Sequence, residues 1–320
     1  MRLSILDRAI FLQLFVIISL SMIIPSIVAF AEKDYFVGRT FLYSSLAGVF
    51  VFLLISIALS NIPKTQNNFD KLVSFILSYL FLPVFMAMPI VLCFDYVSFL
   101  DGWLEMVSAF STTGLNITPV RTSDGSAFQL WIAMISWIGG IFFWIGAVSI
   151  LLPLNISKFE IGVTDFPSGL SNKVHKSSDP VINYARQLIP IYIAITISLW
   201  LLLTLSGVPA FKAVLMSMFV ISTSGFEVTS YNATNIFIVE GIILLFFVFA
   251  LSKSLYIRDI NEIQKFRIFK DPEIRVALII ILAVTVLIFA NSFVVLISEN
   301  AEVPIIFLFK HLWGIFFTVT

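Results

Sequence analysis

Two short polar loops hold the residues of this chain whose types and spacing favour ion chemistry. Phe110–Leu115 has the sequence Phe-Ser-Thr-Thr-Gly-Leu, and Ile221–Phe226 has the sequence Ile-Ser-Thr-Ser-Gly-Phe. Each loop lies between two long apolar runs, which places its single glycine between membrane spans. A pore that strips water from a small cation needs fixed oxygen atoms to replace the lost hydration. The repeated loop therefore predicts a site for a dehydrated monovalent cation.

Backbone carbonyl oxygens are the expected ligands, because neither loop contains an ionised side chain. Gly114 and Gly225 are predicted to adopt backbone angles that other residues avoid, which would turn the neighbouring carbonyl groups toward a shared axis. Threonine and serine hydroxyl groups would be supplementary acceptors. The candidate ion-binding residues are Thr112, Thr113, Gly114, Leu115, Thr223, Ser224, Gly225 and Phe226, together with the carbonyl group of Ser222.

The composition is that of an integral membrane protein. Hydrophobic residues make up 59% of the chain and charged residues only 12%, and the mean hydropathy is +1.04. Runs of about 20 apolar residues predict membrane-spanning helices. We expect an all-α polytopic fold with spans over roughly 12–30, 41–62, 73–97, 128–153, 187–206, 234–252 and 276–297, and a further apolar stretch over 304–320.

The order of elements around the loops predicts a repeated unit of helix, pore loop and helix around a pseudo-symmetric pore. The apolar segments before the loops, Gly102–Phe110 and Ala210–Ile221, reach only about halfway across the hydrocarbon core, so they should enter the membrane and turn back. A third copy would begin at Asp271-Pro272, and the chain is expected to stop inside it. The predicted regions are an N-terminal two-helix region (1–70), a first repeat (71–156), a second repeat with its cytoplasmic connecting loop (157–265) and an incomplete third repeat (266–320).

The charges predict an orientation. With the glycine loops outside, fourteen of the 19 Lys and Arg residues fall on the inner side, which places the N-terminus in the cytoplasm. Nine acidic residues, Glu105 among them, would then face outward against five basic ones. An acidic outer mouth would raise the local concentration of cations.

A Gly-Gly pair in the helix after the first loop completes a recognisable pattern. Trp137-Ile138-Gly139-Gly140, the two Ser-Thr-x-Gly loops and Asp179–Tyr192 resemble the membrane subunit of the Trk/Ktr/HKT potassium transporter superfamily, in its Trk branch. The resemblance covers the whole chain and implies four repeats around one pore, so the chain would be C-terminally truncated. It also implies K+ as the transported ion, bound at the filter residues only, with no covalent cofactor. The same resemblance implies a homodimer and a cytoplasmic nucleotide-binding regulatory subunit. It also implies a location in the bacterial cytoplasmic membrane.

Other interpretations stay open at this point. The chain could be a non-conducting truncated fragment of such a transporter, or a secondary carrier of another small solute. No catalytic motif is present in the sequence, so we expect neither an enzyme nor a nucleic-acid-binding protein. Gly139, Gly140 and Gly146 are interpreted chiefly as close-packing positions between helices. Glu240, in an apolar helix, is expected to be paired, functional or close to the outer interface.

Overall fold

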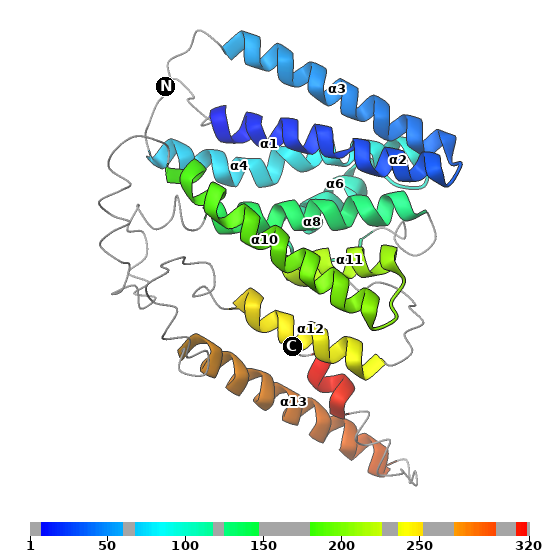
Figure 1. The fold of residues 1–320 in the computed structure, drawn as a ribbon, viewed down its shortest axis with the longest axis vertical. Helices are drawn as coiled ribbons and strands as arrows, with labels where there is room; N and C mark the ends of the chain where they lie inside the picture. Colours follow the sequence, from blue (N-terminus) through cyan, green and yellow to red (C-terminus); the bar gives the residue numbers. More distant parts are fainter. Residues whose placement is uncertain are drawn as a thin grey trace. The chain divides into compact units, whose positions relative to one another are not determined.

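The structure, a computed structural model, describes residues 8–59, 68–117, 125–146, 180–225, 236–251, 272–298 and 312–318, and every regular element within them is a helix (Figure 1). The chain divides into two compact units. The first comprises Met1–Ser198 and Phe211–Tyr231, and the second comprises Leu199–Ala210 and Asn232–Thr320. The helices are α1 (Arg8–Ser21), α2 (Ile23–Ala31), α3 (Tyr35–Leu59), α4 (Asn68–Met86), α5 (Met88–Cys93), α6 (Phe99–Phe110), α8 (Ser126–Gly146), α10 (Pro180–Leu205), α11 (Ala210–Ile221), α12 (Ile236–Leu251) and α13 (Pro272–Ser298).

The predicted polytopic all-α fold is confirmed. Within the described residues, five helical segments are long and apolar enough to cross a membrane: Phe11–Ala31, Tyr35–Ala58, Leu72–Cys93, Ser126–Gly146 and Leu188–Leu205. The last two predicted spans are present as α12 and α13, whose described apolar stretches are shorter. The chain is therefore a multi-pass membrane protein.

Two of the predicted spans are interrupted by prolines. α1 ends at Ser21 and α2 begins at Ile23, with Pro25 in the first turn of α2. α4 and α5 are separated at Ala87, between Pro83 and Pro89. Because proline has no backbone N–H, each proline removes one helical hydrogen bond and leaves a carbonyl group to be satisfied elsewhere.

Other predicted boundaries were wrong by several residues. α3 begins at Tyr35 rather than at 41, because the Asp34 carboxylate accepts the Val37 N–H (3.2 Å) and so caps the helix. The third span ends at Cys93 rather than at 97, since the chain turns there and Val97 is buried beside the start of α6. Hydropathy alone showed neither that the more polar residues 35–40 begin α3 nor that the residues after Cys93 leave the helix.

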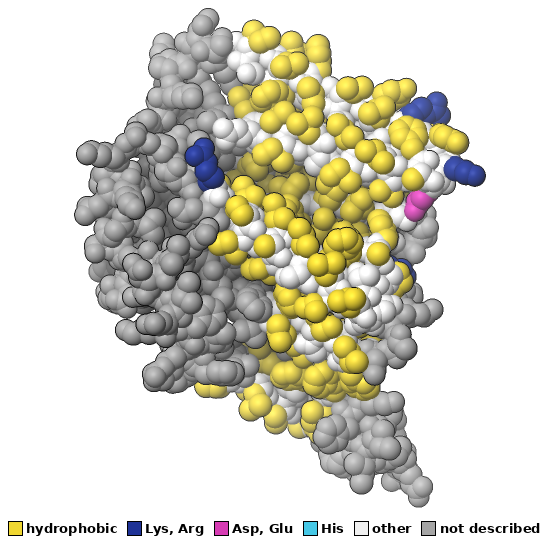
Figure 2. Space-filling view, in the orientation of Figure 1, with side chains coloured by type: hydrophobic (Ala, Val, Ile, Leu, Met, Phe, Trp, Pro, Cys, Tyr) yellow, Lys and Arg dark blue, Asp and Glu magenta, His cyan; other side chains and the backbone are white. Residues whose placement is uncertain are grey.

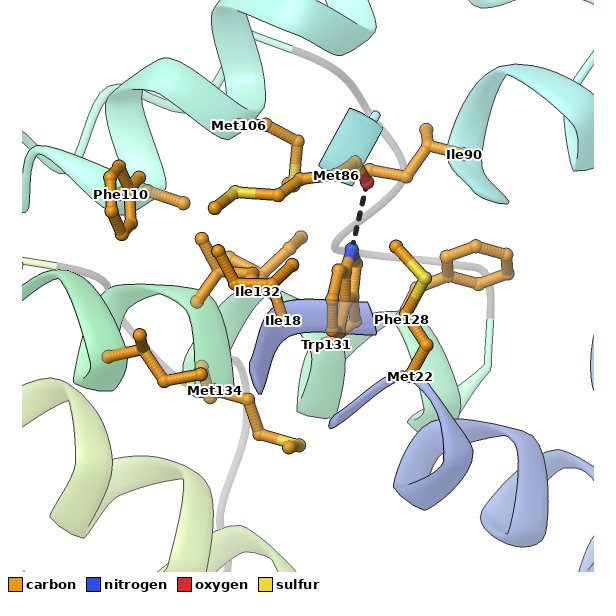
Figure 3. Packing of buried hydrophobic residues seen from close by; sticks show 14 of the residues in the cluster. Ile18, Met22, Met86, Ile90, Met106, Phe110, Phe128, Trp131, Ile132 and Met134 are labelled. Atoms are coloured by element: carbon orange, nitrogen blue, oxygen red, sulfur yellow. Dashed lines mark hydrogen bonds between the residues drawn. The ribbon is translucent and has the colours of Figure 1, made fainter. Parts of the chain in front are cut away.

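The core of the first unit surrounds Trp131 of α8, whose side chain is fully buried. Its indole N–H donates to the Met86 carbonyl oxygen (3.1 Å), which the break before α5 leaves available (Figure 3). Ile18, Met106 and Ile132 pack around it from α1, α6 and α8. A helix that is apolar on all sides is expected at the centre of such a protein, and 72% of the α8 span is buried.

α3 has the opposite character, with only 22% of its span buried. Its exposed side chains are large and apolar, among them Phe50, Leu54 and Ile57. Figure 2 shows apolar side chains covering most of the described surface in this view, with a few Lys and Arg side chains at its margins. Such a surface is suited to contact with lipid.

The second unit contains α12, α13 and a helical segment at 312–318. Trp313 of this segment donates its indole N–H to the Glu240 carboxylate of α12 (2.5 Å). Glu240 is therefore a paired residue, as one of the interpretations of the sequence expected.

Candidate functional site

Two half-length helices position the candidate loops. α6 and α11 have 12 residues each, so each is about 18 Å long, against a hydrocarbon core of about 30 Å. α11 begins and ends at the predicted residues, Ala210 and Ile221. α6 begins at Phe99, three residues before the predicted start, because the Ser98 hydroxyl accepts the Asp101 N–H (3.2 Å) and caps it.

The first half-length helix ends in a compact hydrogen-bonded cap. The N–H of Thr112 donates to the Ala109 carbonyl (3.1 Å), and the N–H of Thr113 donates to the Ser108 carbonyl (2.9 Å). This is the Schellman arrangement, in which the residue after the C-cap adopts a left-handed conformation. That residue is Thr112, with φ of 55°. A β-branched residue is strained there, and glycine is the usual occupant.

The second half-length helix ends in the same way. Thr223 donates to the Val220 carbonyl (3.1 Å), and Ser224 donates to the Phe219 carbonyl (3.1 Å). Thr223 has φ of 52°, which matches Thr112 in the first loop. The two loops thus share one backbone course, including the same strained threonine two residues before the glycine.

The two candidate glycines lie side by side. Gly114 has φ of 80° and Gly225 has φ of 67°, as the sequence predicted. A methyl group at Gly114 would overlap the Ser224 carbonyl oxygen and lie 3.4 Å from the Cα atom of Gly225. The first loop is therefore packed directly against the backbone of the second. At Gly225 the same methyl group would meet open space.

The Gly139-Gly140 pair of α8 packs against the C-terminal ends of both half-length helices. A methyl group at Gly139 would overlap the carbonyl group of Phe110, the last residue of α6. At Gly140 it would lie 3.0 Å from Cβ of Ser222, directly after α11, and 2.9 Å from the Tyr192 hydroxyl. Only glycine allows the backbone of α8 to approach both helix ends so closely. The predicted packing role of this pair is confirmed.

Side-chain hydrogen bonds join α8 to α10 next to this contact. The Trp137 indole N–H donates to the Thr196 hydroxyl (3.0 Å). Tyr192, which is fully buried, donates its hydroxyl to the Trp137 carbonyl (3.2 Å), and the two rings lie 5.1 Å apart. Trp137, the tryptophan of the Trp-x-Gly-Gly pattern, therefore fixes α10 against α8 next to the second loop.

Aromatic rings support the end of α6. The Phe110 ring lies 4.9 Å from the Tyr79 ring and 5.6 Å from the Phe142 ring, and Phe75 lies 4.7 Å from Phe142. A methyl group at Gly146 would overlap the Phe75 ring, so this glycine also serves close packing. A rigid backing of this kind keeps a loop backbone in one position.

The loop hydroxyl groups are hydrogen-bonded locally. The Ser111 hydroxyl donates to the Val107 carbonyl (2.7 Å) and lies 2.7 Å from the Thr113 hydroxyl. The Thr223 hydroxyl donates to the Ser222 carbonyl (2.7 Å). A hydroxyl whose hydrogen is donated presents only its oxygen lone pairs, as a cation requires.

The electrostatics of the site follow from the helix directions. α6 and α11 both end at the loops, so each directs the partial negative charge of its C-terminus there. Two such ends meeting at one place, surrounded by buried apolar side chains, favour a positive charge between them.

The structure brings together Gly114, Ser224 and Gly225 of the predicted set. The predicted residue Phe226 lies outside the described residues. Leu115 is in the loop with an exposed side chain, but its carbonyl oxygen accepts a hydrogen bond from Ser108 (2.9 Å) and so faces α6.

The prediction that Glu105 faces outward with the acidic residues of the outer mouth is wrong. Its side chain is fully buried and accepts the Ile117 N–H (2.8 Å). The signal was present in the sequence, because Glu105 and Ser108 lie three residues apart on one face of α6, whose other residues after Gly102 are apolar.

Relatives of this chain are transporters. No protein-family model matches the chain. It is 29% identical over 219 residues to an uncharacterized cation transporter, MJ1485, of Methanocaldococcus jannaschii, which covers 68% of this chain and 44% of the relative. It is 27% identical over 165 residues to the Trk system potassium uptake protein TrkI of Halomonas elongata, covering 52% of this chain and 33% of the relative. Over 127 residues it is 29% identical to the Trk system potassium uptake protein TrkH of Salmonella typhimurium, covering 40% of this chain and 26% of the relative.

A solved structure shares the fold. The potassium transporter TrkH from Vibrio parahaemolyticus matches 100% of this chain and 64% of its own chain, with a TM-score of 0.72 and 21% identity. The chain therefore spans less than two thirds of the proteins that it matches. These comparisons confirm the predicted TrkH-like resemblance, and they agree with the prediction that the chain is not an enzyme.

Proposed function

We propose that this TrkH-like chain forms part of a channel-like pore for potassium uptake, with its two glycine loops as part of the selectivity filter. The observation that carries the proposal is the contact between the loops: the backbone of Gly114 packs against Ser224 and Gly225. The matched proteins named for potassium uptake support K+ as the ion.

The proposed chemistry is the replacement of water by carbonyl oxygens. An ion entering the narrow site loses hydration, and fixed backbone oxygens of Thr112, Thr113, Thr223 and Ser224 would compensate for that loss. The shared left-handed turns supply the geometry, because they reverse the direction of the carbonyl groups after each helix end. The helix C-termini add a favourable potential without an ionised side chain. Phe226 completes the proposed set in the second loop.

Two loops surround only part of an ion, so we propose that further loops complete the ring. The region 266–320 is the candidate for the start of a third repeat. Its α13 begins at Pro272, just as α10 begins at Pro180, and the proline at the first helical position supports the likeness.

We further propose the orientation and the partners. The positive-inside bias supports an N-terminus in the cytoplasm, and the likeness to Trk proteins supports the bacterial cytoplasmic membrane. The predicted homodimer and the nucleotide-binding regulatory subunit remain part of the proposal, supported by the likeness to Trk proteins alone.

Uptake of 86Rb+ or K+ tests the proposal. The chain is expressed together with the further loops proposed to complete the ring, in a bacterium that lacks its own potassium uptake, beside a Gly225→Ser variant and a Gly241→Ser control. Gly241 lies in α12, and a Cβ atom there would contact nothing. We expect uptake with the chain and the control, and reduced uptake or weakened preference for K+ over Na+ with Gly225→Ser.

The alternatives give different results. A non-conducting fragment would show no uptake although it is present in the membrane. A carrier of another solute would also show potassium uptake no different from that of cells without the chain, but it would take up its own solute. Either result would overturn the proposal.

A further inference from the structure

Two side chains of α6 tie down the segment that follows the first glycine. The Ser108 hydroxyl donates to the carbonyl oxygen of Leu115 (2.9 Å), and the N–H of Ile117 donates to Oε2 of Glu105 (2.8 Å). Glu105 and Ser108 occupy one face of α6, one turn apart. The backbone on the far side of Gly114 is therefore bound back onto the helix that precedes the loop.

The burial of Glu105 makes this tether unusual. Its side chain is 0% exposed, and Ser108 is 4% exposed. Within the part of the chain that the structure describes, Glu105 is the only Asp, Glu, Lys or Arg side chain in the buried class. Removing a carboxyl group from water is unfavourable unless hydrogen bonds replace the water. Here the backbone of the loop supplies such a bond.

The second loop lacks these two anchors. Counting back the same number of residues from Gly225 gives Met216 in place of Glu105 and Phe219 in place of Ser108. Neither side chain can form the corresponding hydrogen bonds. The two loops share their caps and their glycine geometry, but α11 has apolar side chains at the two positions from which α6 tethers the first loop.

We propose that Glu105 and Ser108 are positioning residues that set the ion preference of the site by fixing the backbone that follows Gly114. The inference rests on the proposed function, since it concerns the same loops. Without the tether, Leu115–Ile117 would lose two hydrogen bonds to α6, and the neighbouring carbonyl groups of Thr113 and Gly114 could move away from the position that suits one ion size. Glu105 acts through the backbone and need not touch the ion.

The first experiment measures the tether itself. Hydrogen–deuterium exchange of the purified chain in detergent is followed at the backbone amides of 115–117. Glu105→Met copies the residue of the second helix, Glu105→Gln keeps an acceptor oxygen, and Ser108→Ala removes the other anchor. Because the Ile117 N–H loses its hydrogen-bond acceptor, exchange at Ile117 should rise about 2- to 10-fold in Glu105→Met. The rise should be smaller in Glu105→Gln and Ser108→Ala.

The second experiment measures the ratio of K+ to Na+ uptake in cells, normalised to the amount of chain in the membrane. We expect the ratio to fall in Glu105→Met and to be largely restored in Glu105→Gln. Ser217→Ala and Asp95→Asn are the controls. Ser217 is a buried serine of α11 that donates within its own helix (2.7 Å), and Asp95 is an exposed acid. Both controls should leave the ratio unchanged.

The outcomes separate the two proposals. Unchanged exchange at Ile117 in Glu105→Met, or an unchanged uptake ratio despite faster exchange, would overturn the positioning role. If Glu105→Met does not reach the membrane, Glu105→Gln and Ser108→Ala decide by the same two readouts. If the unmodified chain takes up no potassium, the proposed function fails, and the exchange experiment alone decides whether the tether exists.

Discussion

The first and second loops have the same backbone but are stabilised differently. Each follows a half-length helix of 12 residues and contains a left-handed threonine and a left-handed glycine. The first loop is tethered by Glu105 and Ser108 and backed by the aromatic rings around Phe110. The second is held by packing between Ser222, Gly140 and Tyr192. The comparison shows that the turn is the shared requirement, whereas its support differs between the two loops.

Gly114→Ala should have the largest effect, and Gly225→Ala is its matched comparison. Alanine in a left-handed conformation costs about 1–2 kcal/mol at either position. At Gly114 the new methyl group also overlaps the Ser224 carbonyl oxygen, which adds about 1–3 kcal/mol of overpacking. We expect uptake to fall at least tenfold more in Gly114→Ala than in Gly225→Ala, measured with 86Rb+. Equal losses would contradict the asymmetric contact.

Gly139→Ala should be the next most severe change. Its methyl group would overlap the Phe110 carbonyl group, and the neighbouring backbone has to move. We expect the unfolding free energy to fall by about 1–3 kcal/mol. Thermal unfolding in detergent measures this loss. Gly241→Ala is the control, because its methyl group would contact nothing and alanine favours a helix. A stability gain in both variants would show that α8 does not press on the loop.

Thr112→Gly and Thr223→Gly test what the loops share. Each replacement relieves a threonine held at positive φ, so each should raise the unfolding free energy by about 1 kcal/mol. The gain should have the same sign at both positions, as measured by thermal unfolding. Opposite signs would mean that the two caps are not equivalent.

Tyr192→Phe should have the smallest effect and should be confined to the second loop. It removes the hydroxyl that donates to the Trp137 carbonyl and lies next to Gly140. A buried hydrogen bond of this kind contributes about 0.5–1.5 kcal/mol to stability. Hydrogen exchange at Thr223 and Ser224 should become faster, while exchange at Thr112 and Thr113 stays as it was. Faster exchange in both loops would indicate that the tether does not isolate the first.

Much of the arrangement could be predicted from the sequence. Three features follow from local signals. The chain length between turns gives the bounds of α11, and the proline positions give the starts of α10 and α13 at Pro180 and Pro272. The conformational freedom of glycine gives the left-handed backbone of Gly114 and Gly225. These features depend on neighbouring residues, and the sequence contains that information directly.

Features that depend on distant residues were not predictable in the same way. The break between α4 and α5 leaves the Met86 carbonyl for Trp131, 45 residues later, and hydropathy shows no trace of this pairing. Glu105 was assigned to the outer surface because an acidic side chain is usually solvated. Its burial depends on Ile117, which returns to α6 only after the loop has turned.

The most direct test of the account is the position of a bound ion. A crystal structure of the chain soaked in Rb+ or Tl+ would give an anomalous peak that marks the potassium site. The account predicts a peak between the two loops. The ion should contact backbone carbonyl oxygens of the turn that contains Gly114 and of the turn that contains Gly225. An ion bound elsewhere, or loops that are separated from one another in that structure, would contradict it.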